Sequence, residues 1–306
     1  MRERMKIGVV LPTGEGEAGG GMPDYALVRS LAVDAEAAGL DSIWVSDHLV
    51  MRFPGEPETG VHEAWTILSA LAEATSRVEL GTIVLCGSFR NPGVLAKMAV
   101  ALDIVSNGRL ILGLGSGWHD PEYEAFGFPT DQKVGRFAEA LAIIDGLLAG
   151  ERVTYHGRFH DVEDAVLLPP PARRIPILVA AVRPRMLEIT ARHADQWNTA
   201  WYDLPDERLA TRRAGLDAAL AAAGRDTGSL IQTVGVRVRP VGLAADSPAG
   251  PGALFRGTVA ELAELLDTYE GLGFGHLLAW IDPTTPETLA WLVDAVGRHR
   301  EHLPVG

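Results

Sequence analysis

One alternation runs through most of this chain: a short apolar segment is followed by a loop and then by an amphipathic helical segment. The apolar segments, which we predict to be strands, cover residues 7–11, 42–46, 78–85, 110–114, 177–180, 196–199, 231–238 and 276–280. Strands that are apolar on both faces and separated by helices are typical of a parallel sheet covered by helices. Eight such units predict an α/β fold of the (β/α)8 type, a TIM barrel. An open, doubly wound sheet is the alternative.

Capping motifs support the predicted helices. Asn91-Pro92 and Thr285-Pro286 each place a capping side chain before a proline at the first helical position. Thr258 and Glu261 have the spacing of a capping box. The helix that follows Thr258 has one apolar face with a period of 3.6, formed by Val259, Leu262, Leu265, Leu266 and Tyr269. Gly271 and Gly273 then end this helix.

Two segments depart from the alternation. Residues 150–174 carry β-favouring runs, a His156-Gly157 turn and three prolines, so we expect a hairpin inserted between the fourth helix and the fifth strand. Residues 239–257 form the longest Gly/Pro-rich loop, after the seventh strand, where a mobile lid would lie on the catalytic face of a barrel. We therefore expect residues 1–306 to form a single barrel domain.

Charge and composition exclude several classes of partner. The formal net charge of -13 argues against nucleic acid or an anionic membrane as a partner, because both require a basic face. Cys86 is the single cysteine, so no internal disulfide can form, which fits a reducing cytosol. No apolar run is long enough to cross a bilayer, and the short one before Pro12 reads as a first strand, not a signal peptide. We expect a cytoplasmic enzyme, a homodimer, that acts on a small molecule.

The residues that directly follow each strand converge on one rim of a barrel, where catalytic groups lie. They include the glycine-rich "PTGEGEAGGG" after the first strand, the pair Asp47-His48 after the second, "CGSFRN" after the third and "GSGWHD" after the fourth. "AVRPR" and "AWYD" follow the fifth and sixth strands. Glycines, aromatic residues, one Asp-His pair and several arginines suit a flat aromatic cofactor with an anionic tail.

Two other readings of this rim stay open. A metal-dependent hydrolase would use the acid and imidazole side chains of Asp47-His48, His62-Glu63, His119-Asp120 and His193 with Asp195, although these pairs share no common spacing. A barrel that binds without catalysis is the second. For Asp47-His48 alone, the ordinary interpretation is a capping aspartate beside a loop histidine.

Four stretches in chain order resemble the luciferase-like family of flavin-type oxidoreductases, (β/α)8 barrels that bind FMN or the deazaflavin F420. They are "GLDSIWVSDH", "LGTIVLCGSFRNPGVLAKMAVALDIVSNGRLILGLGSGW", "PILVAAVRPRMLEITARHADQWN" and "FRGTVAELAELLDTYEGLGFGHLLAW". Together they span most of the chain. The second is the most specific, because it combines Arg-Asn-Pro, Asn-Gly-Arg and Gly-x-Gly-x-Gly in a fixed order.

The resemblance implies roles for particular residues. Asp47 and His48 would lie beside the cofactor ring as catalytic residues, with the imidazole near the carbon that exchanges hydride; an imidazole suits this position because its pKa lies near working pH. A non-prolyl cis peptide would fall within Thr82 to Val84. The turns at Gly113, Gly115 and Gly117 would press backbone against a flat ring. Trp118 departs from the acidic residues seen there in sugar-phosphate-oxidising members, so that substrate is not carried over.

The cofactor phosphate would bind after the fifth strand, where relatives have small residues and a helix begins. Here Ala180, Ala181 and Val182 replace the usual glycines, and Arg183 precedes Pro184. Arg183 could pair with the phosphate directly. The predicted cofactor-binding set is Thr82, Ile83, Val84, Cys86, Gly115, Ser116, Gly117, Trp118, Ala180, Ala181, Val182 and Arg183.

The Asp-His pair and the third strand resemble the F420 branch more than the FMN branch. The resemblance therefore predicts F420-dependent hydride transfer to or from a small organic substrate; the alternative is an FMN-dependent monooxygenase that uses reduced flavin and O2. The polyanionic F420 tail would need a local basic cluster in this acidic chain, such as Arg183 and Arg185 with Arg237 or Arg239.

Overall fold

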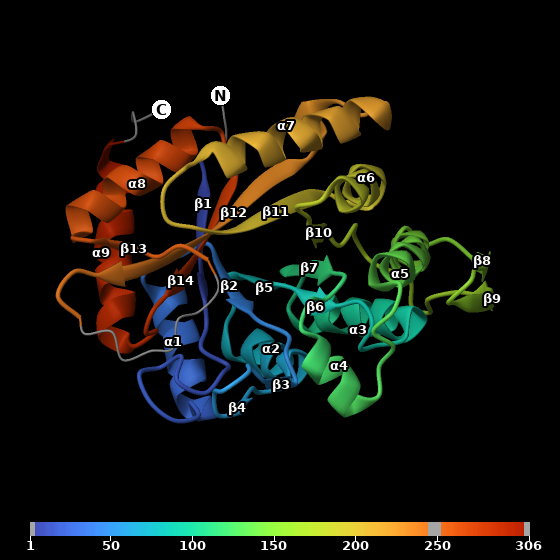
Figure 1. The fold of residues 1–306 in the computed structure, drawn as a ribbon, viewed down its shortest axis with the longest axis horizontal. Helices are drawn as coiled ribbons and strands as arrows, with labels where there is room; N and C mark the ends of the chain where they lie inside the picture. Colours follow the sequence, from blue (N-terminus) through green and yellow to red (C-terminus); the bar gives the residue numbers. More distant parts are fainter. Residues whose placement is uncertain (1–3, 244–251, 303–306) are drawn as a thin grey trace.

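A computed structural model describes residues 4–243 and 252–302, and its eight main strands form a closed barrel (Figure 1). The strands are β1 (Lys6–Val10), β2 (Ser42–Val45), β5 (Glu79–Thr82), β7 (Leu110–Gly115), β10 (Ile177–Ala180), β11 (Gln196–Tyr202), β12 (Ile231–Pro240) and β14 (His276–Ile281). They pair in parallel in the order β10-β11-β12-β14-β1-β2-β5-β7, and β7 pairs with β10 to close the ring. The barrel prediction is confirmed, and the open sheet is excluded.

Helices surround this barrel. They are α1 (Tyr25–Ala37), α2 (Ala64–Ala74), α3 (Pro92–Val105), α4 (Asp120–Phe126), α5 (Lys133–Leu148), α6 (Pro184–His193), α7 (Glu207–Ala222), α8 (Val259–Gly271) and α9 (Pro286–His302). The predicted caps form: Asn91 accepts a hydrogen bond from Val94 N–H at 3.1 Å, and Thr258 and Glu261 make a reciprocal capping box. Thr285 accepts a weaker one from Thr288 N–H at 3.3 Å.

Alternate residues of each strand serve two cores. On β12, Val234, Val236 and Val238 pack outward in the layer between strands and helices. A smaller cluster fills the barrel interior, formed by Val10, Trp44, Ile83, Ile111, Leu178 and Leu278. Trp44 lies so close to Gly81 that a Cβ there would come within 2.1 Å of the indole, so this neighbouring position on β5 needs a glycine.

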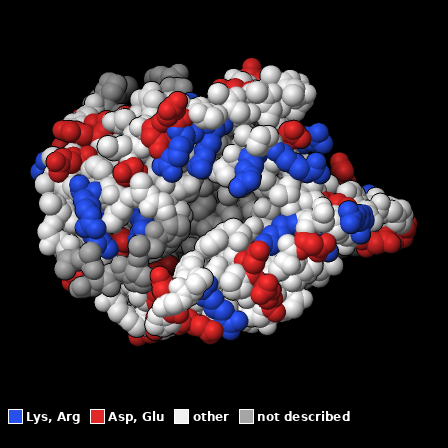
Figure 2. Space-filling view, in the orientation of Figure 1, with Lys and Arg blue, Asp and Glu red and all other residues white. Residues whose placement is uncertain are grey.

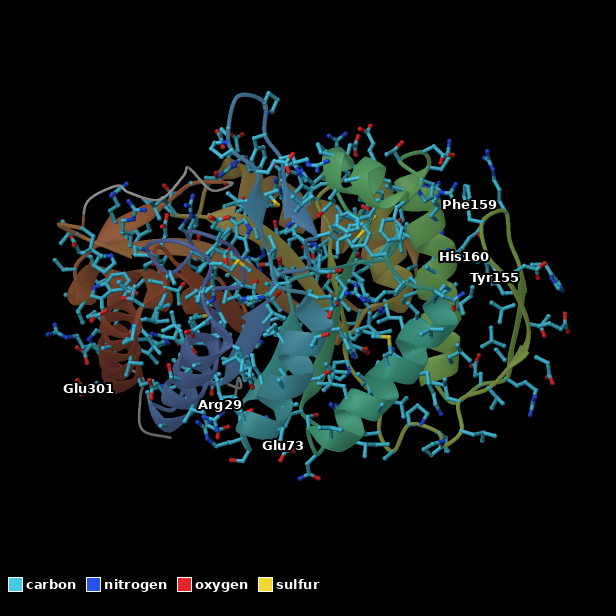
Figure 3. All side chains as sticks on the ribbon, turned by 90° about the horizontal axis from the view of Figure 1, so that it is seen from below. Arg29, Glu73, Tyr155, Phe159, His160 and Glu301 are labelled. Carbon is cyan, nitrogen blue, oxygen red and sulfur yellow. The ribbon has the colours of Figure 1, made fainter. Side chains whose placement is uncertain are left out.

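Short hairpins interrupt the barrel pattern. β8 (Val153–His156) and β9 (Asp161–Ala165) pair antiparallel within the predicted insertion, and Figure 3 shows this hairpin, with Tyr155, Phe159 and His160, at the edge of the molecule. A second hairpin, β3 (Val50–Met51) with β4 (Thr59–Gly60), was not predicted. The remaining short segments are β6 (Leu85–Cys86), which pairs with β7, β13 (Phe255–Gly257), which pairs with β12, and a 3-10 turn, Thr227–Ser229.

The predicted lid over residues 239–257 lies partly outside the described residues, which omit 244–251. Its two ends belong to β12 and β13. None of the helices in the described parts of the chain is long and apolar enough to cross a membrane.

Candidate active site

A cavity of about 780 Å³ opens where the barrel strands end, and all eight main strands contribute to its wall, either through their own residues or through the loops that follow them. Its volume falls in the range of small-molecule and cofactor sites. Figure 2 shows the hollow at the centre of one face, with lysine and arginine side chains gathered along its upper and right-hand margins. The carboxyl ends of barrel strands are where the sequence predicted the site.

Most of the predicted site residues line this cavity. They are Asp47, His48, Ile83, Val84, Cys86, Gly115, Ser116, Gly117, Trp118, Ala180, Ala181 and Val182. Two of the predicted residues do not line it. Thr82 is buried and bonds to β7, where its Oγ1 donates to Gly113 O at 2.7 Å. Arg183 is an exposed residue directly before α6.

Asp47 is buried in an ion pair. Its Oδ2 accepts hydrogen bonds from Cys86 N–H at 2.9 Å and from Arg90 Nη1 at 2.7 Å, and its Oδ1 accepts from Arg90 Nη2 at 3.0 Å. Arg90 also contacts Glu63 at 2.5 Å. Both carboxylate oxygens of Asp47 are therefore engaged, which fits a group that fixes the ends of two neighbouring strands.

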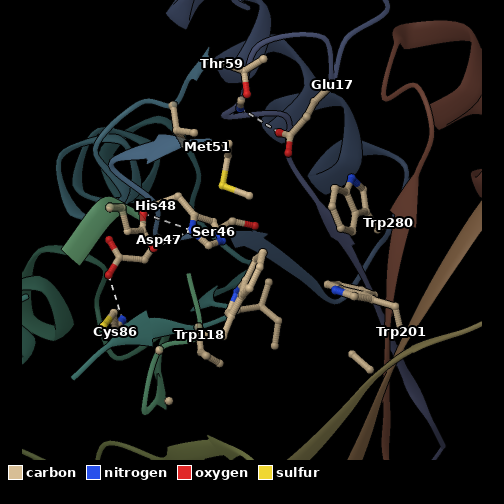
Figure 4. A pocket seen from close by; sticks show the side chains of 18 of the residues that line it. Glu17, Ser46, Asp47, His48, Met51, Thr59, Cys86, Trp118, Trp201 and Trp280 are labelled. Carbon is tan, nitrogen blue, oxygen red and sulfur yellow. Dashed lines mark hydrogen bonds and ion pairs between the residues drawn. The ribbon is translucent and has the colours of Figure 1, made fainter. Parts of the chain in front are cut away.

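His48 faces the cavity with one ring nitrogen held by protein. Its Nδ1 lies 3.1 Å from Glu122 Oε1, and Glu122 Oε2 accepts from Leu49 N–H at 2.9 Å. Glu122 is buried in the first turn of α4. A carboxylate partner selects the tautomer with a proton on Nδ1, which leaves Nε2 for a ligand. Figure 4 shows His48 and Asp47 together on one side of the pocket.

The hairpin β3–β4 forms an outer wall beside His48. Phe53 from this segment stacks on Trp118, with ring centroids 6.4 Å apart, and Trp118 contacts the His48 ring edge-on at 5.6 Å. His119 Nε2 accepts a hydrogen bond from Arg52 N–H at 3.0 Å, and burial lowers the pKa of this histidine. His119 is therefore a structural acceptor that anchors the hairpin.

The peptide bond between Ile83 and Val84 is cis, within the span where the resemblance placed it. A Cβ on Gly115 would come within 2.7 Å of the Val84 side chain, so the glycine on β7 allows the two strand ends to approach. Gly117 has a φ of +75°, and a Cβ there would collide with Tyr123 Oη. A second non-prolyl cis bond, Ala200-Trp201, also borders the cavity and was not predicted.

Cys86 contributes both backbone and side chain. Its thiol contacts Tyr123 Oη at 2.8 Å, and burial raises the pKa of the thiol to about 11. The side chain is therefore a neutral thiol at working pH and fits a wall residue, not a nucleophile.

Glu17 is a cavity residue that the sequence interpretation missed. Its Oε2 accepts hydrogen bonds from Thr13 N–H and Gly14 N–H, both at 2.8 Å. Burial raises the pKa of the Glu17 carboxyl above its ordinary value, against a smaller lowering by these two hydrogen bonds. In Figure 4 Glu17 lies above Trp280, on the other side of the pocket from Asp47 and Cys86. It is a second group that can hold a proton in this cavity.

Arg237 and Arg239 do not join Arg183 and Arg185 in one cluster. Both are buried on β12 and share the carboxylate of Asp282, which follows β14. Arg185 instead lines a second hollow of about 390 Å³ with Lys133, beside the first turn of α5. The basic groups near the expected phosphate position are therefore Arg183 and Arg185, because Lys133 is already paired with Asp120.

The first turn of α6 can receive an anion. Pro184 occupies the first helical position, and no side chain caps the helix, so backbone N–H groups of its first turn stay available. Val182, two residues before the helix, lines the cavity. A ligand ring in the cavity could thus extend a phosphate toward this helix start.

The His–acid pairs weighed as metal ligands do not converge. Within residues 4–243 and 252–302, no group of three or more His, Cys, Asp or Glu side chains is placed to hold a metal ion. Asp47, His48 and His119 are occupied instead by Arg90, Glu122 and the Arg52 backbone, as described above.

Comparisons with known proteins agree with one another. A family model described as luciferase-like monooxygenase matches residues 5–249. An F420-dependent glucose-6-phosphate dehydrogenase of Amycolatopsis mediterranei (strain U-32) is 37% identical over 170 residues, 54% of this chain and 50% of that protein. A phthiodiolone/phenolphthiodiolone dimycocerosates ketoreductase of Mycobacterium kansasii is 36% identical over 225 residues, 67% of this chain and 61% of that protein.

The chain thus spans between half and 61% of the length of these two relatives. Among solved structures, an F420-dependent secondary alcohol dehydrogenase in complex with an F420-acetone adduct superposes with a TM-score of 0.80. That likeness covers 97% of this chain and 100% of the other at 16% identity, and it shows the shared barrel fold.

Proposed function

Because the chain belongs to the luciferase-like monooxygenase family, we propose that it is an oxidoreductase that uses F420 for hydride transfer to or from a small organic substrate. Relatives that share more than a third of the aligned residues are named as F420-dependent dehydrogenases or as a ketoreductase. The observation that carries the proposal is His48, which faces the cavity with Nδ1 held by the buried carboxylate of Glu122.

The residues present fit a flat cofactor with a phosphate. Ile83, Val84, Gly115 and Trp118 offer an apolar wall and close backbone, and the uncapped start of α6 offers donors to an anion. When bound, F420 would supply a carbon that accepts or releases hydride. Arg183 and Arg185, at the start of α6, would offer positive charge to an acidic tail, which supports F420 despite the acidic character of the whole chain.

The chain's own part in the reaction is to position, to exclude water and to move a proton. His48 Nε2 would give a proton to a carbonyl oxygen, or take one from an alcohol, as the substrate changes oxidation state. Glu122 fixes the tautomer, and the Asp47-Arg90 pair holds the strand end that carries His48. Trp201 and Trp280, whose rings meet edge-to-face at 5.0 Å, keep the opposite wall apolar.

Titration of the purified protein with F420 and, separately, with FMN tests this proposal. We expect F420 to bind with a micromolar or lower Kd, followed by its absorbance and fluorescence, and FMN to bind more weakly. The loaded enzyme should then oxidise reduced F420 with a panel of small ketones. Tight binding of FMN without F420 would point to the monooxygenase alternative, and binding of neither would refute a flavin-type cofactor. The expected homodimer and cytoplasmic location stay predictions, the first of which sedimentation would check.

A further inference from the structure

Two buried arginines share one carboxylate at the edge of the cavity. Arg237 Nη2 lies 2.5 Å from Asp282 Oδ2, and Arg239 Nη2 lies 2.9 Å from the same oxygen. Arg239 also donates through Nε to Asp282 O at 2.7 Å. Arg237 is 5% exposed, yet it borders the cavity, and among the described residues its Nε has no hydrogen-bond partner. Its guanidinium is thus only partly satisfied by protein.

The charges at this edge do not balance. Arg237 and Arg239 bring two positive charges, and Asp282 brings one negative charge. Two further acids line the cavity from the loop after β1, the exposed Glu15 and Glu17, and in the described residues no ion pair joins either of them to Arg237 or Arg239. One buried positive charge therefore remains, and a buried charge is costly unless an opposite charge accompanies it.

This edge lies across the barrel from the expected cofactor wall. The expected cofactor residues follow β5, β7 and β10, which are adjacent in the ring. Arg237 and Asp282 come from β12 and the end of β14, and β14 lies four strands from β7 in either direction around the ring. The surplus charge therefore faces the part of the cavity that a cofactor ring against Val84 and Gly115 would leave to the substrate.

Arg237 also packs against an aromatic side chain. Its Cζ lies 5.4 Å from the centroid of the Trp280 ring, and Trp280 meets Trp201. Both indoles border the cavity. Such a site combines one guanidinium group with an apolar wall. A carboxylate carries a single negative charge and two oxygens that match a guanidinium, whereas a phosphate dianion calls for more donors than one partly satisfied arginine.

We propose that the substrate carries a carboxylate on an apolar body, and that Arg237 binds this carboxylate while Trp201 and Trp280 contact the body. The inference rests on the proposed function only in naming this molecule a substrate. Arg237 would thereby set substrate specificity from the side of the cavity opposite the cofactor.

Matched probes test this inference without knowledge of the natural substrate. Calorimetric titration would compare benzoate with benzamide, and 3-phenylpropionate with its amide, on protein with and without F420. We expect each acid to bind the unmodified protein about tenfold more tightly than its amide. Arg237→Gln should remove this preference and leave amide binding unchanged, and Arg237→Lys should retain part of it. Arg29→Gln, an exposed arginine on α1, is the matched control.

Several outcomes would overturn the inference. These are equal affinity for acid and amide in the unmodified protein, absence of binding for both pairs, or a preference that survives in Arg237→Gln. A loss of F420 affinity in Arg237→Gln as large as the loss of acid affinity would make Arg237 a cofactor residue instead. Should Arg237→Gln fail to fold, the unmodified protein and Arg237→Lys still decide the question.

The same titrations separate the two proposals. A carboxylate preference without F420 binding would refute the proposed function and support this site as an anion-binding one. F420 binding without a carboxylate preference would leave the proposed function standing and refute this inference.

Discussion

His48 and Glu122 are 74 residues apart in the chain, and the histidine Nδ1 lies 3.1 Å from the carboxylate Oε1. The other oxygen of Glu122 accepts from the Leu49 backbone, so one buried acid holds both the imidazole and the loop that carries it. This relationship turns the Asp-His pair at the end of β2 into two groups with separate partners, Asp47 with Arg90 and His48 with Glu122.

Replacing His48 by alanine should lower turnover by about a hundredfold to ten-thousandfold, the range for losing a positioned acid or base. Folding and F420 affinity should stay nearly unchanged, because the side chain borders the cavity and is not part of the core. Stopped-flow measurement of hydride transfer with saturating F420 would check this. A rate near that of the unmodified enzyme would make His48 a spectator.

Glu122→Gln tests the positioning role of the carboxylate. The amide can still accept from Leu49 N–H, but it no longer places a negative charge beside His48. We expect kcat to fall by roughly tenfold to a hundredfold with little change in KM, because the imidazole loses the charge-assisted contact that holds its orientation. Glu124→Gln, an exposed acid on the same helix, should leave both unchanged. An unchanged kcat in Glu122→Gln, or a rise in KM as large as the fall in kcat, would argue against the role.

Asp47→Asn should act mainly on stability. The substitution removes the charge from a buried bidentate pair with Arg90, at a cost of about 2 to 3 kcal/mol in the free energy of unfolding. Asp131→Asn, which breaks a surface pair with Arg136, should cost less than about 1 kcal/mol. Urea unfolding of both variants checks the difference. Equal stability with a large loss of turnover in Asp47→Asn would instead support a direct catalytic role.

Arg183→Ala should weaken F420 binding by about 1.5 kcal/mol, roughly tenfold, the lower end for a charge-assisted hydrogen bond because this side chain is exposed. Fluorescence titration would measure the change, with Arg29→Ala as the control for loss of a surface charge. An unchanged Kd would make Arg183 a solvated residue at a helix start.

Stability should fall in mild acid because of His276. Burial, with a smaller effect of Lys6, lowers the pKa of this histidine to about 3, and the ring bonds to Ser42 Oγ at 2.7 Å. Below about pH 6.5 this histidine is protonated in the unfolded chain but stays neutral in the folded protein. The free energy of unfolding therefore falls by about 1.4 kcal/mol per pH unit until the pKa of the folded state is reached. Urea unfolding of His276→Gln between pH 7.5 and 5.5 should show a shallower slope than the unmodified protein.

The strands could be predicted because each is a nearly continuous apolar run, and a strand buried on both faces leaves that pattern in sequence. β10 agrees with its predicted span, and β2 and β7 differ from theirs by one residue. The hairpin β3–β4 was missed because each of its strands has only two residues, which is too short for an apolar run or an alternation to stand out.

The site was predictable only where it lies next to a strand end. Asp47, His48, Val84 and Gly115 follow or end strands, so strand positions place them at the rim. Arg90, Glu122 and Glu17 reach the site from a loop, a short helix and a glycine-rich turn, and only the folded chain shows which partner each meets. Arg237 was named from the sequence as part of a basic cluster for the cofactor tail. In the fold it is buried and shares Asp282 with Arg239 instead.

The ring order also divides the chain into two halves of four consecutive strands. β1, β2, β5 and β7 precede the β8–β9 hairpin, and β10, β11, β12 and β14 follow it. The halves meet at two seams, β7 with β10 and β1 with β14. One seam borders the expected cofactor wall, and the other borders the wall of Trp280 and Asp282. Any molecule that fills the cavity therefore contacts both half-barrels and links them.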